Sequence, residues 1–213
     1  MFISSLITIT SLIIVYIKIN KSYKEGFFYG IFLITLLPKS ISLYDEMFSA
    51  QRLILLLLLL NYIVNHEYFK KKCKSNFQII LVVICIFKII SAILGFNILV
   101  SLKLVLLFTF EIVTYFTIIL VYVRTDEDIK KIAILMFIAV SIPSFFGILE
   151  RWFGIRIMNY LTAYNTDLRI GVDIASTYIH PILFGVGLTI GWMLGFYYIN
   201  LIEKGNIKRS EER

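Results

Sequence analysis

The chain has 213 residues, of which 59% are hydrophobic and 16% are charged, and its net charge is +7. Soluble domains are typically about 45–50% apolar and about 25% charged, so this composition excludes an ordinary soluble protein. The positive charge does not indicate a nucleic-acid partner, because the Lys and Arg residues of membrane proteins collect in cytoplasmic loops. The sequence therefore predicts a protein embedded in membrane lipid.

Apolar runs separated by charged segments predict an all-α fold, a polytopic helical membrane protein with about seven transmembrane helices. A helix needs about 20 mostly apolar residues to cross the bilayer, and several runs approach that length. The second and third spans have the least definite bounds, because Pro38 interrupts one and the uninterrupted core of the other is short. The predicted spans are 2–17, 26–43, 47–64, 77–96, 98–123, 129–149 and 181–199. We expect a single transmembrane domain over residues 1–213.

The distribution of basic residues predicts the orientation of these spans. Most of the 21 Lys and Arg residues fall in the loops after the first, third and fifth spans and in the C-terminal tail. The side richer in Lys and Arg faces the cytoplasm. The N-terminus and the loop 150–180 are then expected to face outward. At the start of the sixth span, Thr125 and Asp128 predict a capping box.

Two ionisable residues, Lys88 and Glu111, fall inside predicted spans. A charge near the bilayer centre costs at least about 2.5–3.5 kcal/mol and usually faces a partner or water. Because the two residues lie at similar depths, we predict a structural ion pair between the fourth and fifth spans. The alternative is a proton or ion relay, which normally needs more ionisable residues than these spans contain.

Glycine recurs at every fourth position in the seventh span, at Gly187, Gly191 and Gly195. This spacing places the three residues on one helix face and permits close approach of a neighbouring helix. We therefore expect a packing face, which puts the seventh span inside the bundle rather than against lipid.

A cluster of polar side chains precedes the seventh span and is the candidate site. Pro181 is expected to open the span, because proline suits the first position of a helix. An outward-facing helix N-terminus offers unpaired N–H groups and partial positive charge, both suited to phosphate. Arg169 adds a planar cation whose geometry matches phosphate oxygens. Together these features predict a pyrophosphate-binding site at the outer membrane surface.

Three residues near this cluster have two interpretations each. His180 is either a base or phosphate ligand, or a helix cap or hydrogen-bonded residue. Arg151 and Arg156 flank Trp152 and are either further phosphate or glycan contacts, or anchors at the membrane surface. The sequence has no metal-ligand cluster, no nucleotide-binding glycine loop and no nucleophile–His–acid spacing, so we predict neither a metal nor a cofactor.

Three short segments resemble a known family: Gly-Ile-Leu-Glu-Arg-Trp-Phe-Gly at 147–154, Leu-Arg-Ile-Gly at 168–171 and His-Pro-Ile-Leu-Phe-Gly at 180–185. They are similar to the central region of the O-antigen ligase and O-antigen polymerase family, and the preceding spans fit that family loosely. Its members are polytopic, metal-independent glycosyltransferases of bacterial envelopes. They transfer a glycan from an undecaprenyl-pyrophosphate donor to an acceptor sugar on the outer side of the cytoplasmic membrane.

The resemblance implies a glycosyltransferase of the bacterial cytoplasmic membrane whose partner is a lipid-linked glycan. It implies that Arg169 binds the donor pyrophosphate and that His180 has a supporting role in the catalytic site, and it assigns no base to this chain. Arg151 and Arg156 are further candidates for contacts with the pyrophosphate.

The sequence departs from the family's pattern in two places. The segment 172–177 is longer than its counterpart in the family, and family members continue for several more spans with a second outer loop that carries the catalytic histidine. We therefore expect this chain to correspond to the N-terminal half. The alternative function is that of a non-catalytic polytopic membrane protein: a transporter part, a scaffold or an inactive truncated remnant.

Overall fold

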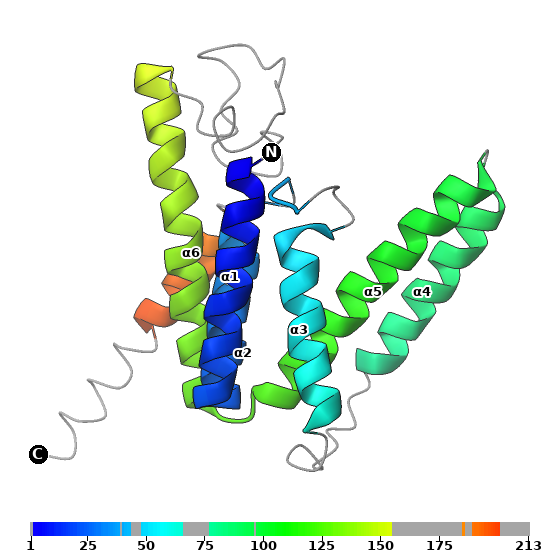
Figure 1. Ribbon diagram of the computed structural model, residues 1–213, viewed down its shortest axis with the longest axis horizontal. Helices are drawn as coiled ribbons and strands as arrows, with labels where there is room; N and C mark the ends of the chain where they lie inside the picture. The colour runs from blue at the N-terminus through cyan, green and yellow to red at the C-terminus, as the bar shows by residue number, and fades with distance from the viewer. Residues whose placement is uncertain are drawn as a thin grey trace, which may run out of the picture. The chain divides into compact units, whose positions relative to one another are not determined.

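The computed structural model describes residues 2–38, 40–43, 48–65, 77–95, 97–154, 185 and 189–200. In these ranges the regular structure is helical apart from an isolated antiparallel bridge between Ser42 and Ser49, so the all-α prediction is confirmed for them. A further helical segment covers residues 189–200 and is called the 189–200 helix below. The six labelled helices of Figure 1 are α1 (Phe2–Lys21), α2 (Tyr23–Leu36), α3 (Ala50–Val64), α4 (Phe77–Ile93), α5 (Ile98–Tyr122) and α6 (Asp126–Phe153).

Three of these helices, α1, α5 and α6, are long and apolar enough to cross a membrane. Helices α2, α3 and α4 have 14, 15 and 17 residues. At 1.5 Å per residue they measure roughly 21–26 Å, which is less than the hydrocarbon core of about 30 Å. The described residues thus support a polytopic membrane protein with three helices of spanning length, and they do not support the predicted seven.

The bounds predicted for the second span, 26–43, are wrong. Helix α2 follows α1 after the single residue Ser22 and ends at Leu36. Leu37 has extended backbone angles, φ −85° and ψ 130°, because the ring of Pro38 disfavours the helical conformation of the residue before it. Lys18 and Lys21, which the charge pattern assigned to a loop, form the last turn of α1.

The chain divides into two compact units, residues 1–54 with 125–213, and residues 55–124. The boundary falls inside α3. In the first unit α1 packs on α2 and α2 packs on α6, and in the second unit α4 packs on α5. Each unit is described by itself below.

Small residues let α1 and α2 form a close hairpin in the first unit. The buried face of α1 consists of Ser4, Thr8, Ser11, Val15 and Ile19. The hydroxyls of Thr8 and Ser11 donate hydrogen bonds to carbonyl oxygens one turn earlier in α1, so these buried polar groups are satisfied within the helix. A Cβ atom at Gly26 of α2 would lie 2.8 Å from Ile19 Cα. The hairpin therefore requires glycine at this position.

An ion pair joins the N-terminal ends of α2 and α6. Lys24 Nζ lies 3.1 Å and 3.0 Å from the two carboxylate oxygens of Asp128, a residue that is only 6% exposed. The same carboxylate accepts a hydrogen bond from the backbone N–H of Thr125, whose hydroxyl accepts one from the N–H of Asp128. The predicted capping box is confirmed. Nearby, Lys131 Nζ lies 4.3 Å from the ring centroid of Phe28.

At the opposite end of the first unit, hydrogen bonds join described residues between α2 and α3, and the first turn of α3, to α1 and α2. Ser4 Oγ of α1 donates to the Ser42 carbonyl and accepts from the Ser42 N–H. Gln51 Nε2 donates to the carbonyl oxygens of Ile34 and Leu37, which satisfies two acceptors at the C-terminal end of α2. This end of the unit therefore holds the N-terminus of α1 and the C-terminal end of α2.

Polar side chains near the ends of helices organise the second unit. Asn97 opens α5, and its side-chain oxygen accepts a hydrogen bond from the N–H of Val100. Asn61 Nδ2 of α3 donates to the hydroxyl of Tyr122 at 2.8 Å, and Asn65 donates to the Asn61 side-chain oxygen at 2.9 Å. Tyr122 is fully buried at the end of α5.

Candidate functional site

Most of the predicted pyrophosphate site lies outside the described residues. Arg156, Arg169, His180, Pro181 and Gly187 all fall there, and their predicted roles stay predictions. The structure does describe the helices that flank this stretch, namely α6 before it and the 189–200 helix after it. The C-terminal end of α6 shows at which end of the first unit the described chain stops before this stretch.

Helix α6 reaches further into the predicted outer loop than the sequence suggested. The loop was predicted to start at 150, but the helix continues to Phe153. It ends at Gly154, whose left-handed angles (φ 68°, ψ 11°) suit glycine and whose N–H donates to the carbonyl oxygen of Glu150. Arg151 lies in the last turn, where a cation is favoured by the helix dipole, and its side chain is exposed, as is that of Trp152.

Glu150 is a buried acid at this end of α6 that the sequence analysis did not single out. It is 4% exposed and takes part in an interaction within the chain. The burial of Glu150 could have been predicted from the helical spacing, because Pro143, Gly147 and Glu150 are three or four residues apart and so lie on one face of α6. The negative charge of a carboxylate in the last turn of a helix interacts unfavourably with the helix dipole. The stability of α6 therefore does not explain an acid at position 150.

The 189–200 helix packs against α6 in the antiparallel direction. A Cβ atom at Gly191 would lie 2.6 Å from Val140 Cγ1, and one at Gly195 would lie 2.8 Å from Phe137 Cδ2. Higher residue numbers on one helix thus meet lower numbers on the other. Both glycines of the predicted packing face that are described here approach α6 closely.

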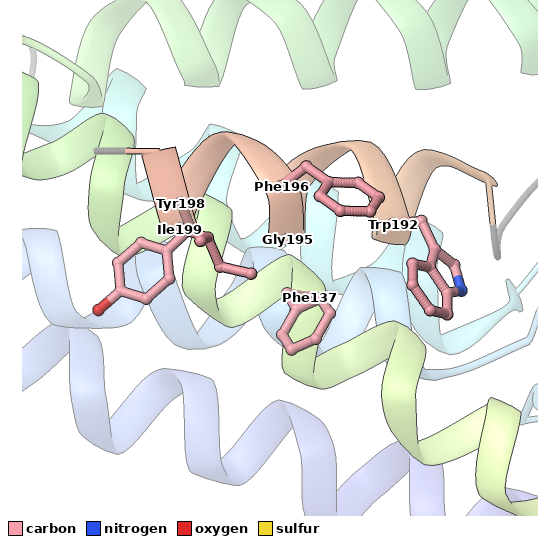
Figure 2. A pocket seen from close by; sticks show the side chains of 6 residues that line it. All are labelled: Phe137, Trp192, Gly195, Phe196, Tyr198 and Ile199. Atoms are coloured by element: carbon pink, nitrogen blue, oxygen red, sulfur yellow. The ribbon is translucent and has the colours of Figure 1, made fainter. Parts of the chain in front are cut away.

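A small cavity of about 130 Å³ lies between these two helices (Figure 2). Phe137 of α6 points toward the 189–200 helix at Gly195, and aromatic side chains of that helix flank it. The lining residues are Phe137, Trp192, Gly195, Phe196, Tyr198 and Ile199. Because no charged side chain lines it, this cavity is suited to hydrocarbon and cannot replace the predicted phosphate site.

Two contacts, Lys24 with Asp128 and Phe28 with Lys131, show that α2 and α6 run in the same direction. Their N-terminal ends meet at Lys24 and Asp128, so their C-terminal ends lie at the other end of the first unit, beside the N-terminus of α1. The stretch between Gly154 and the 189–200 helix therefore begins at the end opposite to Lys18, Lys21 and Lys24. Because the 189–200 helix runs antiparallel to α6, its first residues lie nearer that end than its last residues do.

Lys88, in the second unit, contacts an aromatic ring of α5. Its ammonium lies 5.0 Å from the ring centroid of Phe108, one turn before Glu111. Such a cation–π contact contributes about 0.5–2 kcal/mol, which is less than the cost of about 2.5–3.5 kcal/mol for a charge at the bilayer centre. The ion pair between Lys88 and Glu111 stays a prediction. It was predicted because the two residues lie at similar depths in the membrane, and the contact of Lys88 with Phe108, one turn before Glu111, agrees with that.

Comparison with known protein families, with curated proteins and with solved structures finds no match for this chain. The resemblance to the O-antigen ligases and polymerases rests on the three short segments and a loose fit of the preceding spans, and of the three segments the structure describes 147–154 in full.

Proposed function

We propose that the chain is a membrane glycosyltransferase of the O-antigen ligase or polymerase type. In this proposal the chain crosses the bacterial cytoplasmic membrane about seven times. Helices α2, α3 and α4 and the 189–200 helix each form part of one of these spans. The chain acts on an undecaprenyl-pyrophosphate-linked glycan at the outer face. The single observation that carries the proposal is the antiparallel pairing of α6 with the 189–200 helix, combined with the motif residues in the stretch between them.

The charge distribution of the first unit supports the orientation that this function needs. Lys18, Lys21 and Lys24 lie at the end where α6 begins, and the end richer in lysine faces the cytoplasm. The opposite end, from which the motif stretch leaves at Gly154, then faces outward. A lipid-linked glycan that has been moved to the outer leaflet presents its pyrophosphate on that side.

The proposed chemistry is displacement at the anomeric carbon of the donor glycan. A hydroxyl oxygen of the acceptor forms the new glycosidic bond, while the bond between the anomeric carbon and the pyrophosphate oxygen breaks and undecaprenyl pyrophosphate leaves with the electron pair. In this proposal the proton of the acceptor hydroxyl passes to His180, which here takes the role that the family gives to a histidine of a later outer loop. Arg169, assisted by Arg151 and Arg156, binds the pyrophosphate and stabilises the negative charge that develops on it.

The test is transfer of glycan by the full chain, purified and placed in liposomes with an undecaprenyl-pyrophosphate oligosaccharide and an acceptor glycan. The proposal expects glycan-extended acceptor and an equal amount of released undecaprenyl pyrophosphate. His180→Ala should abolish both products and leave donor binding intact. A wild-type chain that neither binds the donor nor transfers its glycan would overturn the proposal, and a chain that binds without transfer would refute the catalytic part.

A further inference from the structure

The apolar cavity between α6 and the 189–200 helix is elongated along the two helices. Because these helices are antiparallel, the residues that follow Gly195 lie nearer the N-terminal end of α6. In Figure 2, Ile199 and Trp192 accordingly lie on opposite sides of Phe137. The cavity therefore extends from Trp192 toward the end of the first unit at which α6 begins.

Lys130 lies on the side of α6 that carries Phe137. The two residues are seven positions apart, which is close to two helical turns, so their side chains leave one face of α6 about 10 Å apart along its axis. Lys130 is exposed and takes part in none of the ion pairs that the described residues form, whereas the neighbouring Lys131 lies over the ring of Phe28. An ammonium group able to bind an anion thus lies two turns from an apolar cavity.

The distance between Lys130 and the cavity matches a lipid of the leaflet on the Lys130 side. One leaflet contributes half of a hydrocarbon core of about 30 Å, so its chains reach about 15 Å. Phe137 lies about 10 Å from Lys130 and about 20 Å from Glu150, the first charged residue toward the other end of α6. A chain anchored beside Lys130 therefore reaches the cavity, and a chain of the opposite leaflet does not.

The size of the cavity suits a segment of one such chain. Its volume is about 130 Å³. An apolar cavity of about 150 Å³ takes one benzene molecule, so this cavity holds roughly five or six carbon atoms. The rest of the chain then lies along the helices toward Lys130.

We propose that α6 and the 189–200 helix bind one anionic phospholipid, of the phosphatidylglycerol class, from the leaflet on the side of Lys130. A segment of one fatty acyl chain fills the cavity, and the Lys130 ammonium donates hydrogen bonds to the phosphate of the headgroup. A free phosphate ion would leave the apolar cavity empty, so a lipid satisfies both parts of the site. The proposal uses residues of the first unit alone and is independent of the glycosyltransferase function.

The preference of this site for an anionic lipid is expected to be that of a single lysine. Asp126 and Glu127, in the first turn of α6, lie three or four positions before Lys130, and their negative charges offset the charges of neighbouring lysines. One lysine near an anionic headgroup contributes about fivefold in affinity. The anionic lipid should therefore be preferred about fivefold over a zwitterionic one.

Trp192 lines the cavity and can report directly on its occupant. The chain has two Trp residues, so Trp152→Phe leaves Trp192 as the only indole. The full chain with this change is placed in phosphatidylcholine liposomes that contain increasing fractions of a lipid with brominated acyl chains, which quench indole fluorescence on contact. Brominated phosphatidylglycerol should quench Trp192 at an about fivefold lower fraction than brominated phosphatidylcholine.

Two pairs of variants test the headgroup and the chain separately. Lys130→Met should abolish the preference for phosphatidylglycerol, whereas Lys21→Met, which removes an exposed lysine of α1 at the same end of the unit, should keep it. Ile199→Phe enlarges a side chain that lines the cavity and should reduce quenching by both lipids. Ile190→Phe makes the same change elsewhere on the 189–200 helix and should not.

The comparison of the two lipids needs only the Trp152→Phe chain, so it decides the question even if Lys130→Met does not fold. Equal quenching by the two lipids, or no quenching by either, would overturn the proposal. A preference that is unchanged in Lys130→Met, or that is lost equally in Lys21→Met, would also overturn it. Recovery of fluorescence on addition of inorganic phosphate would assign the site to a free ion instead of a lipid.

Discussion

Lys24 of α2 binds both carboxylate oxygens of Asp128, the residue that also caps the start of α6. Two helices separated by about one hundred residues of sequence are thereby joined at the end of the first unit that carries most of its lysines. The pair lies close to the expected cytoplasmic interface, where neither charge has to be moved into hydrocarbon.

Replacing Asp128 should therefore destabilise the first unit more than replacing Lys24. Asp128→Ala removes a cap worth about 1 kcal/mol and hydrogen bonds to a charged group worth about 1.5–3 kcal/mol. Lys24→Met removes only the second contribution. The measurement is the free energy of unfolding in detergent micelles. Lys21→Met is the control, since Lys21 is exposed and lies 4.0 Å from Glu25, and it should cost at most about 0.5 kcal/mol. Equal effects of all three changes would show that the ion pair does not hold α2 and α6 together.

The two glycines of the 189–200 helix should tolerate alanine poorly. Gly191→Ala would place a Cβ atom 2.6 Å from Val140 Cγ1, and overpacking of this kind typically costs about 1–3 kcal/mol. Gly185→Ala is the control, because no atom lies within 4 Å of its added Cβ. The thermal midpoint of the purified protein is the readout.

A second-site change sharpens this test. Val140→Gly removes all three side-chain atoms that the Cβ of Gly191→Ala would meet, at 2.6, 2.8 and 3.4 Å, so Gly191→Ala should cost less stability in a Val140→Gly background than in the wild type. If Gly191→Ala and Gly185→Ala behaved alike, the close contact between α6 and the 189–200 helix would be refuted.

The hydroxyl of Tyr122 should contribute to the second unit through Asn61. Tyr122→Phe deletes the acceptor of the 2.8 Å hydrogen bond without changing the packing of the ring. Hydrogen bonds between membrane helices contribute about 0.6 kcal/mol on average and up to about 1.7 kcal/mol. We expect a loss in that range on unfolding in micelles, and no loss for Tyr16→Phe, whose side chain is exposed. A stability of Tyr122→Phe equal to that of Tyr16→Phe would exclude a contribution from this bond.

The two ends of the first unit should differ in their accessibility from outside the cell. In a Cys73→Ser, Cys85→Ser background, Arg151→Cys should react with an impermeant maleimide in intact cells, and Lys21→Cys should react only after lysis. These positions were chosen because α1 and α6 place them at opposite ends of the unit. The reverse pattern would place the motif stretch in the cytoplasm and exclude an outer-face reaction.

The sequence predicted the bounds of α2 less well than those of the other helices, for a physical reason. Helices α4, α5 and α6 begin at breaks in the apolar pattern, and the predicted starts at 77, 98 and 129 agree with Phe77, Ile98 and, within three residues, Asp126. Lys18 and Lys21 do not break α1, because a lysine in the last turn of a helix is favoured by the helix dipole. Charge alone therefore could not distinguish the turn at Ser22 from a long loop.

Only part of the candidate site could be predicted from the sequence. The four-residue spacing of Gly191 and Gly195 predicted a packing face, but it could not identify Val140 and Phe137 of α6 as the residues opposite. Glu150 and the contact between Lys24 and Asp128 were missed, because burial of an acid depends on which helix packs against it. The roles of Arg169 and His180 come from the family resemblance and stay predictions.

Binding of undecaprenyl pyrophosphate to Arg169 variants is the most direct test of the proposed function. Guanidinium can bond two phosphate oxygens at once, whereas lysine keeps the charge and loses that geometry. With purified full chain in nanodiscs, Arg169→Lys should weaken binding clearly and Arg169→Ala should weaken it further, while the thermal midpoint stays unchanged. Arg209→Ala, in the tail expected to face the cytoplasm, is the matched control and should bind like the wild type. An affinity of Arg169→Ala equal to that of the wild type would contradict the account.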